Sequence, residues 1–152
     1  MVRILFVCHG NICRSPMAEF VMKDIVNRAG RGSEYEIASA ATSTEELGNP
    51  VYPPVRKLLS LQGIDVSGKT ARQMEKGDYK RFDLLVGMDE ANIRNMNRIC
   101  GSDPEGKIKL LLSYTGADRP VTDPWYTRDF ACAYRDILSG CQALFEALEG
   151  AR

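Results

Sequence analysis

The chain has 152 residues, about the size of one domain, and its 44% hydrophobic and 26% charged residues are typical of a soluble globular protein. Twenty basic residues balance twenty acidic ones, which argues against nucleic acid or a membrane surface as a partner, because both usually require a basic excess. Any anion that the protein binds must therefore be held by local geometry rather than by a general positive field.

The chain opens with a strand, a polar loop and a helix. The β-branched and apolar run from Arg3 to Val7 is typical of a strand buried on both faces. A polar loop over 8–15 follows, and Pro16 is expected as the first residue of a helix capped by Ser15. The later elements are expected as a strand over 35–41, a helix from Pro53 to Gly63, a strand over 82–88, a helix capped by Asp89 and ending near Ile99, a strand over 107–112, a loop over 118–126 and a last helix with its apolar stripe from Phe130 to Leu148.

This alternation of strands and helices predicts an α/β fold in a single domain over 1–152. Right-handed crossovers between consecutive strands imply a four-stranded parallel sheet flanked by helices on both faces. Ligands of such sheets bind beyond the carboxyl ends of the strands, and the 8–15 loop lies at one of these ends.

The 8–15 loop has the composition of an anion site. Backbone N–H groups in a turn between a buried strand and a helix can converge on one point, and the helix dipole adds positive potential there. Gly10 permits close approach, and Asn11 tolerates the left-handed region. Such a nest favours the thiolate form of Cys8, and the planar fork of Arg14 can hold two oxygens of a tetrahedral dianion. Together these groups indicate phosphoryl transfer to sulfur.

The order of motifs along the chain resembles the low-molecular-weight protein tyrosine phosphatase family. The segment Val-Cys-His-Gly-Asn-Ile-Cys-Arg-Ser-Pro, with its Cys-x5-Arg-Ser pattern near the N-terminus, is similar to the family signature. The resemblance spans nearly the whole chain and implies a flavodoxin-like topology. The further matching segments, in family order, are Ser39 to Ser43, Gly63 to Asp65, Ala71 to Gln73, Phe82-Asp83, Met88-Asp89 and Asp123 to Tyr126.

The resemblance implies a role for each residue of the site. Cys8 would attack phosphorus, Arg14 would hold the transferring group, and Asp123 would protonate the leaving oxygen and then activate the water that hydrolyses the phosphocysteine. Ser15 would donate to the sulfur of Cys8. The expected phosphate-binding residues are Cys8, His9, Gly10, Asn11, Ile12, Cys13, Arg14 and Ser15, with Ser39 as the supporting partner of Asn11.

No cofactor and no metal are expected, because the arginine and the amides supply the charge that a metal ion supplies elsewhere. His9 is the only histidine, and Cys8, His9 and Cys13 have no second ligand pair at zinc spacing. Cys13 is either a packing residue or a thiol that forms a reversible disulfide with Cys8 on oxidation. Trp125 and Tyr126 either stack on an aromatic substrate ring or are exposed without a function.

The chain is expected in the cytoplasm. Its N-terminal apolar run is far too short for a signal peptide or a membrane span, and five cysteines are an odd number for a disulfide framework. The expected partners are phosphotyrosine-containing proteins, a tyrosine kinase among them, and phosphate or similar oxyanions in the site.

Three features depart from the family pattern: His9 replaces a leucine, Glu45-Glu46 replaces an aromatic residue followed by histidine, and Gly68 replaces a histidine. With one aromatic wall missing and two carboxylates in its place, acidic phosphopeptides should be repelled and basic or compact substrates tolerated better.

Other functions on this scaffold fit the sequence less well. Arginine phosphatases tend to carry threonine where this chain has Ile12, and arsenate reductases need a cysteine pair in mid-chain, where only Cys100 lies. A phosphate-binding module without catalysis would need neither the thiolate nor the acid, and the loop lacks the Gly-Lys-Ser/Thr of a Walker site. Phosphotyrosine, phosphoarginine and small phosphate esters remain open as substrates.

Overall fold

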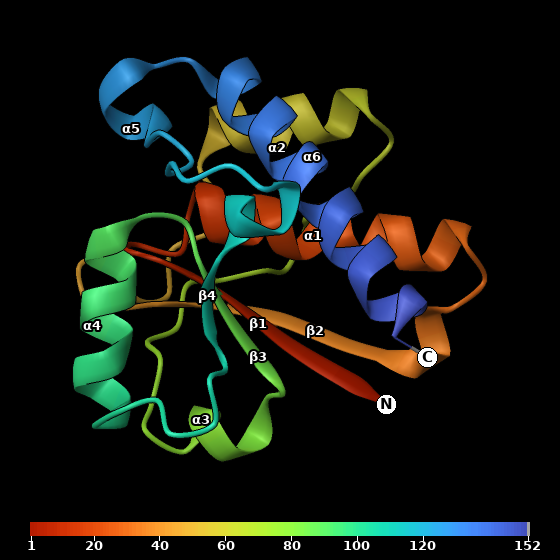
Figure 1. The fold of residues 1–152 in the computed structure, drawn as a ribbon. Helices are drawn as coiled ribbons and strands as arrows, with labels where there is room; N and C mark the ends of the chain where they lie inside the picture. Colours follow the sequence, from red (N-terminus) through yellow and green to blue (C-terminus); the bar gives the residue numbers. More distant parts are fainter. Residues whose placement is uncertain (152) are drawn as a thin grey trace.

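Strand β1 (Val2–Cys8) lies inside the sheet, between β2 (Tyr35–Ala41) and β3 (Leu84–Gly87). Strand β4 (Ile108–Leu110) pairs with the other edge of β3, and all three pairings are parallel. The computed structural model describes residues 1–151, and Figure 1 shows their arrangement around this sheet. The predicted four-stranded parallel sheet is confirmed.

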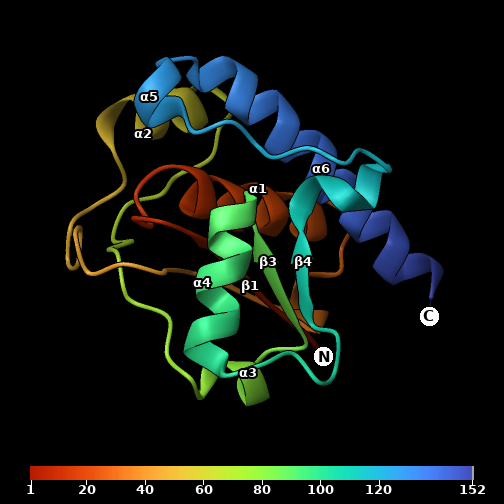
Figure 2. The ribbon, with the colours of Figure 1, turned by 60° about the vertical axis from the view of Figure 1, so that its left-hand side comes forward.

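Alternate residues of β1 enter two different cores. Ile4 and Phe6 belong to the cluster that also holds the buried residues of helices α1 (Arg14–Arg28) and α6 (Phe130–Gly150). Leu5 and Val7 belong to a second cluster, which holds the buried face of helix α4 (Glu90–Cys100). Each fully buried large apolar side chain contributes about 1.5–3 kcal/mol to folding. Helices therefore cover both faces of the sheet, as predicted, and Figure 2 shows α1 and α6 on one side with α3 and α4 on the other.

Helix α1 begins earlier than predicted, at Arg14 rather than at Pro16. Cys13 is the residue before its first turn, and no side chain caps that turn. Proline at the third helical position costs little, because the first four N–H groups of a helix have no partner within the helix. Ser15 does not act as the cap, since its hydroxyl is bonded to Cys8 and Asn11 instead.

The remaining elements follow the prediction with shifts at their ends. Asp89 caps α4 as predicted, and its carboxylate accepts the backbone N–H of Asn92 in a capping box. The segment 111–115 is a 3-10 helix, so the strand expected to reach 112 ends at Leu110, and three further short helical elements were not predicted. The elements not yet bounded are η1 (Gly32–Glu34), α2 (Pro53–Leu61), α3 (Asp78–Arg81), η2 (Leu111–Thr115) and α5 (Pro124–Thr127).

The expected loop over 118–126 contains helix α5, which begins at Pro124. A proline at the first helical position and an aspartate before it both favour a helix start, and the Asp123 carboxylate accepts the backbone N–H of Trp125. Within residues 1–151, none of the helices combines the length and the apolar character that crossing a membrane requires.

Candidate active site

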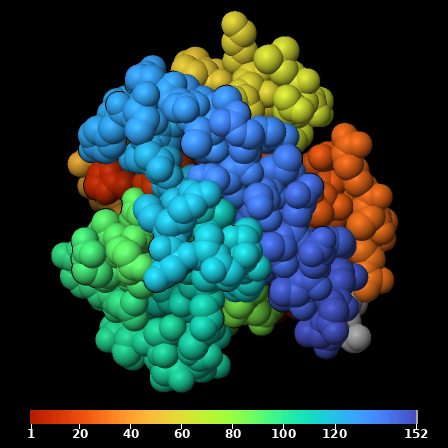
Figure 3. Space-filling model, turned by 45° about the horizontal axis from the view of Figure 1, so that its top comes forward, coloured from red at the N-terminus to blue at the C-terminus, as the bar shows by residue number. Residues whose placement is uncertain are grey.

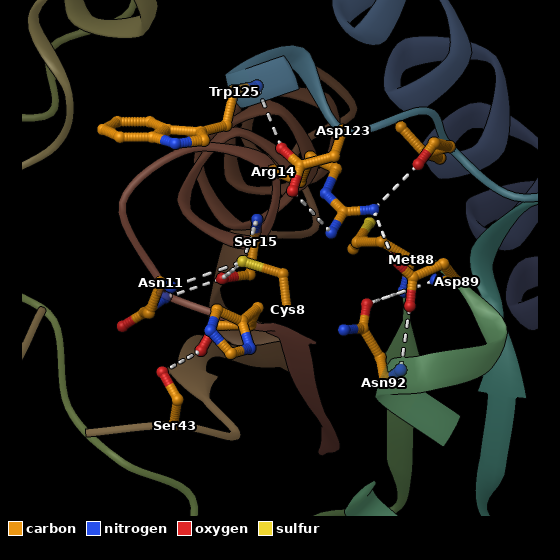
Figure 4. A network of polar contacts seen from close by, with 12 residues as sticks. Cys8, Asn11, Arg14, Ser15, Ser43, Met88, Asp89, Asn92, Asp123 and Trp125 are labelled. Carbon is orange, nitrogen blue, oxygen red and sulfur yellow. Dashed lines mark hydrogen bonds and ion pairs between the residues drawn. The ribbon is translucent and has the colours of Figure 1, made fainter. Parts of the chain in front are cut away.

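The sulfur of Cys8 lies at the carboxyl end of β1, where it is the focus of several donors. The backbone N–H groups of Asn11 and Ser15 each lie 3.4 Å from it, and the Ser15 hydroxyl oxygen lies 3.0 Å away. Figure 4 shows these contacts converging on the sulfur from one side. Donors placed in this way favour a thiolate over a thiol, because only the ionised sulfur is a strong acceptor.

Asn11 gives the segment after β1 its shape. Its φ of 60° is left-handed, which asparagine tolerates better than most residues. Its side-chain amide donates to the Ser15 hydroxyl at 2.7 Å and to the Ser39 hydroxyl at 3.0 Å, while its carbonyl accepts the backbone N–H of Arg72 at 3.2 Å. The contact expected between Asn11 and Ser39 is therefore present.

Arg14 is anchored at both ends of its guanidinium. Its Nη1 donates to Asp89 Oδ2 at 2.9 Å and to the carbonyl of Val121 at 2.8 Å, and its Nη2 lies 3.5 Å from Asp123 Oδ2. Burial acts to lower the pKa of Arg14, but the negative charges of Cys8, Asp123 and Asp89 outweigh it and raise the pKa. The result is a fixed cation beside the sulfur.

Asp123, from the C-terminal part of the chain, lies beside the guanidinium of Arg14. Its Oδ1 accepts the backbone N–H of Trp125 at 3.0 Å, which leaves Oδ2 directed at Arg14. In Figure 4 the Asp123 carboxylate lies between Trp125 and Arg14. Trp125 and Tyr126 follow on α5 with exposed fractions of 44% and 82%, and the ring of Trp125 packs 5.0 Å from that of Tyr52.

One pocket joins these groups, and the predicted wall residues line it. The Ser15 and Ser39 hydroxyls lie behind the pocket rather than in it. Figure 3 shows the red N-terminal segment at the surface between the blue segment around α5 and the green start of α4. The lining residues are Cys8, His9, Gly10, Asn11, Ile12, Cys13, Arg14, Glu45, Glu46, Asp123, Trp125 and Tyr126.

Cys13 is buried in the floor of this pocket. Burial, with the negative charges of Cys8 and Asp123, raises the pKa of the Cys13 thiol to about 12, so it is protonated at neutral pH. All five cysteines are free thiols.

The comparison with known proteins agrees with this geometry. The model of the family described as low molecular weight phosphotyrosine protein phosphatase matches residues 3–152. The low molecular weight protein-tyrosine-phosphatase YfkJ of Bacillus subtilis is 35% identical over 151 residues, which cover 98% of this chain and 97% of YfkJ. The chain belongs to the low molecular weight phosphotyrosine protein phosphatase family. This phosphatase is thus a phosphoric monoester hydrolase, and the resemblance seen in its sequence is confirmed.

Solved structures agree with the fold of the phosphatase. The crystal structure of YfkJ matches it with a TM-score of 0.96 at 34% identity, covering 100% of this chain and 97% of that one. A Drosophila arginine phosphatase matches with a TM-score of 0.88 at 29% identity, covering 95% and 96%. Wzb of Vibrio vulnificus, solved in complex with benzylphosphonate, matches with a TM-score of 0.82 at 26% identity, covering 94% and 96%.

Sequence reasoning missed three residues that support the site of this phosphatase. Asp89 was interpreted as a helix cap within a segment that matches the family, and no contact with Arg14 was predicted, although its position after β3 places it at the same edge of the sheet as Cys8. Buried Glu19 and partly buried Lys69 form an ion pair behind Ser39, and no local pattern marks either of them. Among residues 1–151, no three histidine, cysteine or acidic side chains lie close enough to hold a metal ion.

Proposed function

We propose that this phosphatase hydrolyses phosphotyrosine monoesters in proteins through a phosphocysteine intermediate on Cys8, without a metal ion. The observation that supports this most strongly is the meeting of three groups in one pocket: a sulfur held by two N–H groups and a hydroxyl, an anchored guanidinium, and a carboxylate.

Each group has one task in the proposed reaction. The Cys8 thiolate attacks phosphorus and forms the S–P bond, while Arg14 and the backbone amides of the 8–15 segment hold the three equatorial oxygens. The P–O bond to the phenol breaks, and protonated Asp123 gives its proton to the leaving oxygen. A water molecule then gives a proton to the Asp123 carboxylate as it attacks phosphorus, which releases phosphate and returns the electron pair to the sulfur.

An aromatic leaving group suits the wall of the pocket. Trp125 is half exposed beside Asp123 and is backed by the ring of Tyr52. An offset or edge contact with a substrate ring would add about 0.5–1.5 kcal/mol to binding. Wzb was solved in complex with benzylphosphonate, which also carries an aromatic ring. The expected partners are therefore proteins that carry phosphotyrosine, with a tyrosine kinase among them.

The likeness to an arginine phosphatase makes phosphoarginine the competing substrate. Ile12 lines the pocket of this chain with an apolar, β-branched side chain, and this environment favours a phenyl ring over a guanidinium. This preference is measured as the ratio of kcat/KM on a phosphotyrosine peptide to kcat/KM on a phosphoarginine peptide of the same sequence.

The first test is hydrolysis of p-nitrophenyl phosphate in the presence of EDTA and a reducing agent. We expect turnover at the same rate with and without the chelator, because the charge on the transferring group is met by Arg14 and backbone amides. Phosphotyrosine and phosphoarginine peptides of one sequence are then compared. Loss of activity in EDTA with recovery on adding Mg²⁺ would contradict the mechanism, and a higher kcat/KM on phosphoarginine would contradict the substrate.

We also propose that the acidic wall of the pocket selects against acidic peptides. Glu45 and Glu46 line the pocket, and Glu45 Oε2 lies 3.0 Å from Nε2 of His9, the residue after the proposed nucleophile. Both partners of this pair are more than half exposed, so the pair itself contributes little to stability. Its carboxylate therefore remains available to charges on a bound peptide.

The double variant Glu45→Gln with Glu46→Gln tests this selectivity. We expect the ratio of kcat/KM on a basic peptide to that on an acidic phosphotyrosine peptide to fall about three- to tenfold, the effect of removing charges near a solvated site. For the parent, the same ratio should approach one as the salt concentration rises, because salt screens the interactions between exposed charges. Glu75→Gln, an exposed glutamate outside the pocket lining, is the control. An unchanged ratio in the double variant would refute selection by the wall.

A further inference from the structure

Behind Trp125, which lines the pocket, lies a cluster of aromatic rings that holds one cation. The ring of Tyr52 lies 5.0 Å from that of Trp125 and 6.0 Å from that of Phe130. The guanidinium of Arg128, the residue that follows helix α5, lies over two of these rings, with Cζ 5.3 Å from the centroid of Tyr52 and 5.1 Å from that of Phe130. Nη2 of Arg128 also donates to the hydroxyl of Tyr52 at 3.0 Å. The cation is therefore held one ring away from the pocket wall.

The backbone of Arg128 has a conformation that arginine disfavours. Its φ of 60° and ψ of 12° are left-handed, and glycine or asparagine is the usual residue at this place after a helix. Strained residues of this kind persist where the surrounding structure holds them, and they gather at functional sites. The contacts with Tyr52 and Phe130 hold the side chain, so a cation occupies a position where the backbone alone would favour glycine.

The charge of Arg128 is open to a ligand. Arg128 is exposed, and among residues 1–151 no carboxylate forms an ion pair with it and no group accepts from its Nε or Nη1. The neighbouring carboxylate of Asp129 accepts the backbone N–H of Cys132 instead. A guanidinium with open donors in a planar fork matches the geometry of a carboxylate.

The same charge acts on the pocket. Burial raises the pKa of the Cys13 thiol in the pocket floor, and the positive charge of Arg128 opposes this rise, so the field of the guanidinium reaches the floor. The Arg128 side chain does not itself line the pocket. An extended peptide advances about 3.3 Å per residue, so a side chain within a few positions of the phosphotyrosine would meet Arg128 when the phosphotyrosine lies in the pocket.

Charge of the opposite sign borders another part of the pocket. Glu45 lines it and pairs with His9, whose carbonyl accepts the Ser43 hydroxyl at 2.9 Å. In Figure 4, Trp125 lies above the sulfur of Cys8 and Ser43 lies below it. The mouth of the pocket thus has an acidic border and a basic border on different sides.

We infer that Arg128 is a specificity-determining residue that binds an acidic side chain flanking the phosphotyrosine of a substrate and so fixes, together with Glu45, the direction of the peptide across the pocket. The inference rests on the proposed phosphotyrosine activity. It also refines the selection proposed for the acidic wall, because the position of a charge in the peptide then matters as well as its sign. A basic residue is favoured on the Glu45 side, and an acidic residue is favoured on the Arg128 side.

Two phosphotyrosine peptides of identical composition test this inference. One carries glutamate two residues before the phosphotyrosine and lysine two residues after it, and the other has these two residues exchanged. Because both peptides have the same net charge, general electrostatic steering acts on them equally. We expect the parent to hydrolyse one of them with a kcat/KM about two- to fivefold higher, the effect of an exposed ion pair. The ratio of the two kcat/KM values should approach one at high salt.

Arg128→Gly is the main variant, because glycine adopts the left-handed backbone without strain and removes the guanidinium. We expect the ratio between the two peptides to fall toward one, through a lower kcat/KM on the favoured peptide. This ratio does not depend on the fraction of enzyme that is folded, so a loss of stability cannot imitate the effect. Arg128→Lys keeps the charge and should retain more of the ratio. Arg98→Met, which removes an exposed arginine in the last turn of α4, is the control and should give the parent ratio.

The outcomes separate this inference from the proposed function. If the parent hydrolyses neither phosphotyrosine peptide, the proposed function is wrong and this inference fails with it. If the parent hydrolyses both peptides equally well, or if Arg128→Gly lowers kcat/KM on both by equal factors, Arg128 only supports the cluster of rings and the inference alone is overturned. A parent preference that Arg128→Gly removes and Arg128→Lys partly retains supports it.

Discussion

Cys8→Ser is expected to reduce hydrolysis of an aryl phosphate on the order of 10⁶-fold, the loss seen when an enzyme is deprived of its nucleophile. A serine hydroxyl is not ionised at neutral pH, and the hydrogen-bond partners of Cys8, which are the Ser15 hydroxyl and two backbone N–H groups, include no base to activate it. The backbone donors around the sulfur remain, so the variant should still bind vanadate or phosphate. Steady-state rates and calorimetric titration measure the two properties separately.

Two controls accompany this variant. Cys132→Ser replaces a partly exposed thiol on α6 and should retain the parent rate. Iodoacetamide followed by mass spectrometry should label Cys8 before Cys13, because the high pKa of Cys13 keeps it protonated, and phosphate should protect Cys8. Turnover by Cys8→Ser near the parent rate, or labelling of Cys8 that phosphate does not slow, would remove this residue from the mechanism.

Asp123→Asn is expected to lower kcat/KM about 10²- to 10⁴-fold on phenyl phosphate, whose leaving group needs a proton. The loss should shrink as the leaving phenol becomes more acidic, because an activated phenolate departs without protonation. Asparagine can still accept the backbone N–H of Trp125, so the start of α5 is preserved. A series of substituted phenyl phosphates, plotted as log kcat/KM against phenol pKa, measures this dependence.

Asp129→Asn is the matched control for the acid. Asp129 caps the next helix through the backbone N–H of Cys132, as Asp123 caps α5, but it is not among the partners of Arg14, which are Asp89, Val121 and Asp123. The Asp129→Asn variant should give the same slope of log kcat/KM against phenol pKa as the parent. An equal loss at Asp123→Asn across the whole series would show that Asp123 only orients Arg14, through the 3.5 Å contact between their side chains.

The parts of the site that the sequence predicts are those built from neighbouring residues. A buried strand, a turn with Gly10 and Asn11, and a helix start lie within one short segment, so their types alone indicate convergent amides. The exact start of α1 was misplaced because serine is usually a good cap. In this fold the hydroxyl of Ser15 is used at the sulfur, and the tertiary contact overrides the local preference.

The contacts that were not predicted join residues far apart in the chain. Arg14 donates to the carbonyl of Val121, and Glu19 accepts from Ser39, and neither pairing leaves a periodic or spacing signal. Helix α5 is a different case. Its start was marked locally by Asp123 and Pro124, but the same pair is common in turns, and nothing nearby distinguishes the two.

The anchoring of Arg14 on Val121 also bears on synthesis at the ribosome. The two residues are separated by 107 positions. The strand that carries Cys8 is therefore synthesised long before the segment that completes the pocket. Contacts of such long range form slowly, and a growing chain would carry the proposed nucleophile, Cys8, long before the proposed acid, Asp123, has been translated. We therefore expect a chain truncated before α5 to be inactive on aryl phosphates even if its sheet has formed.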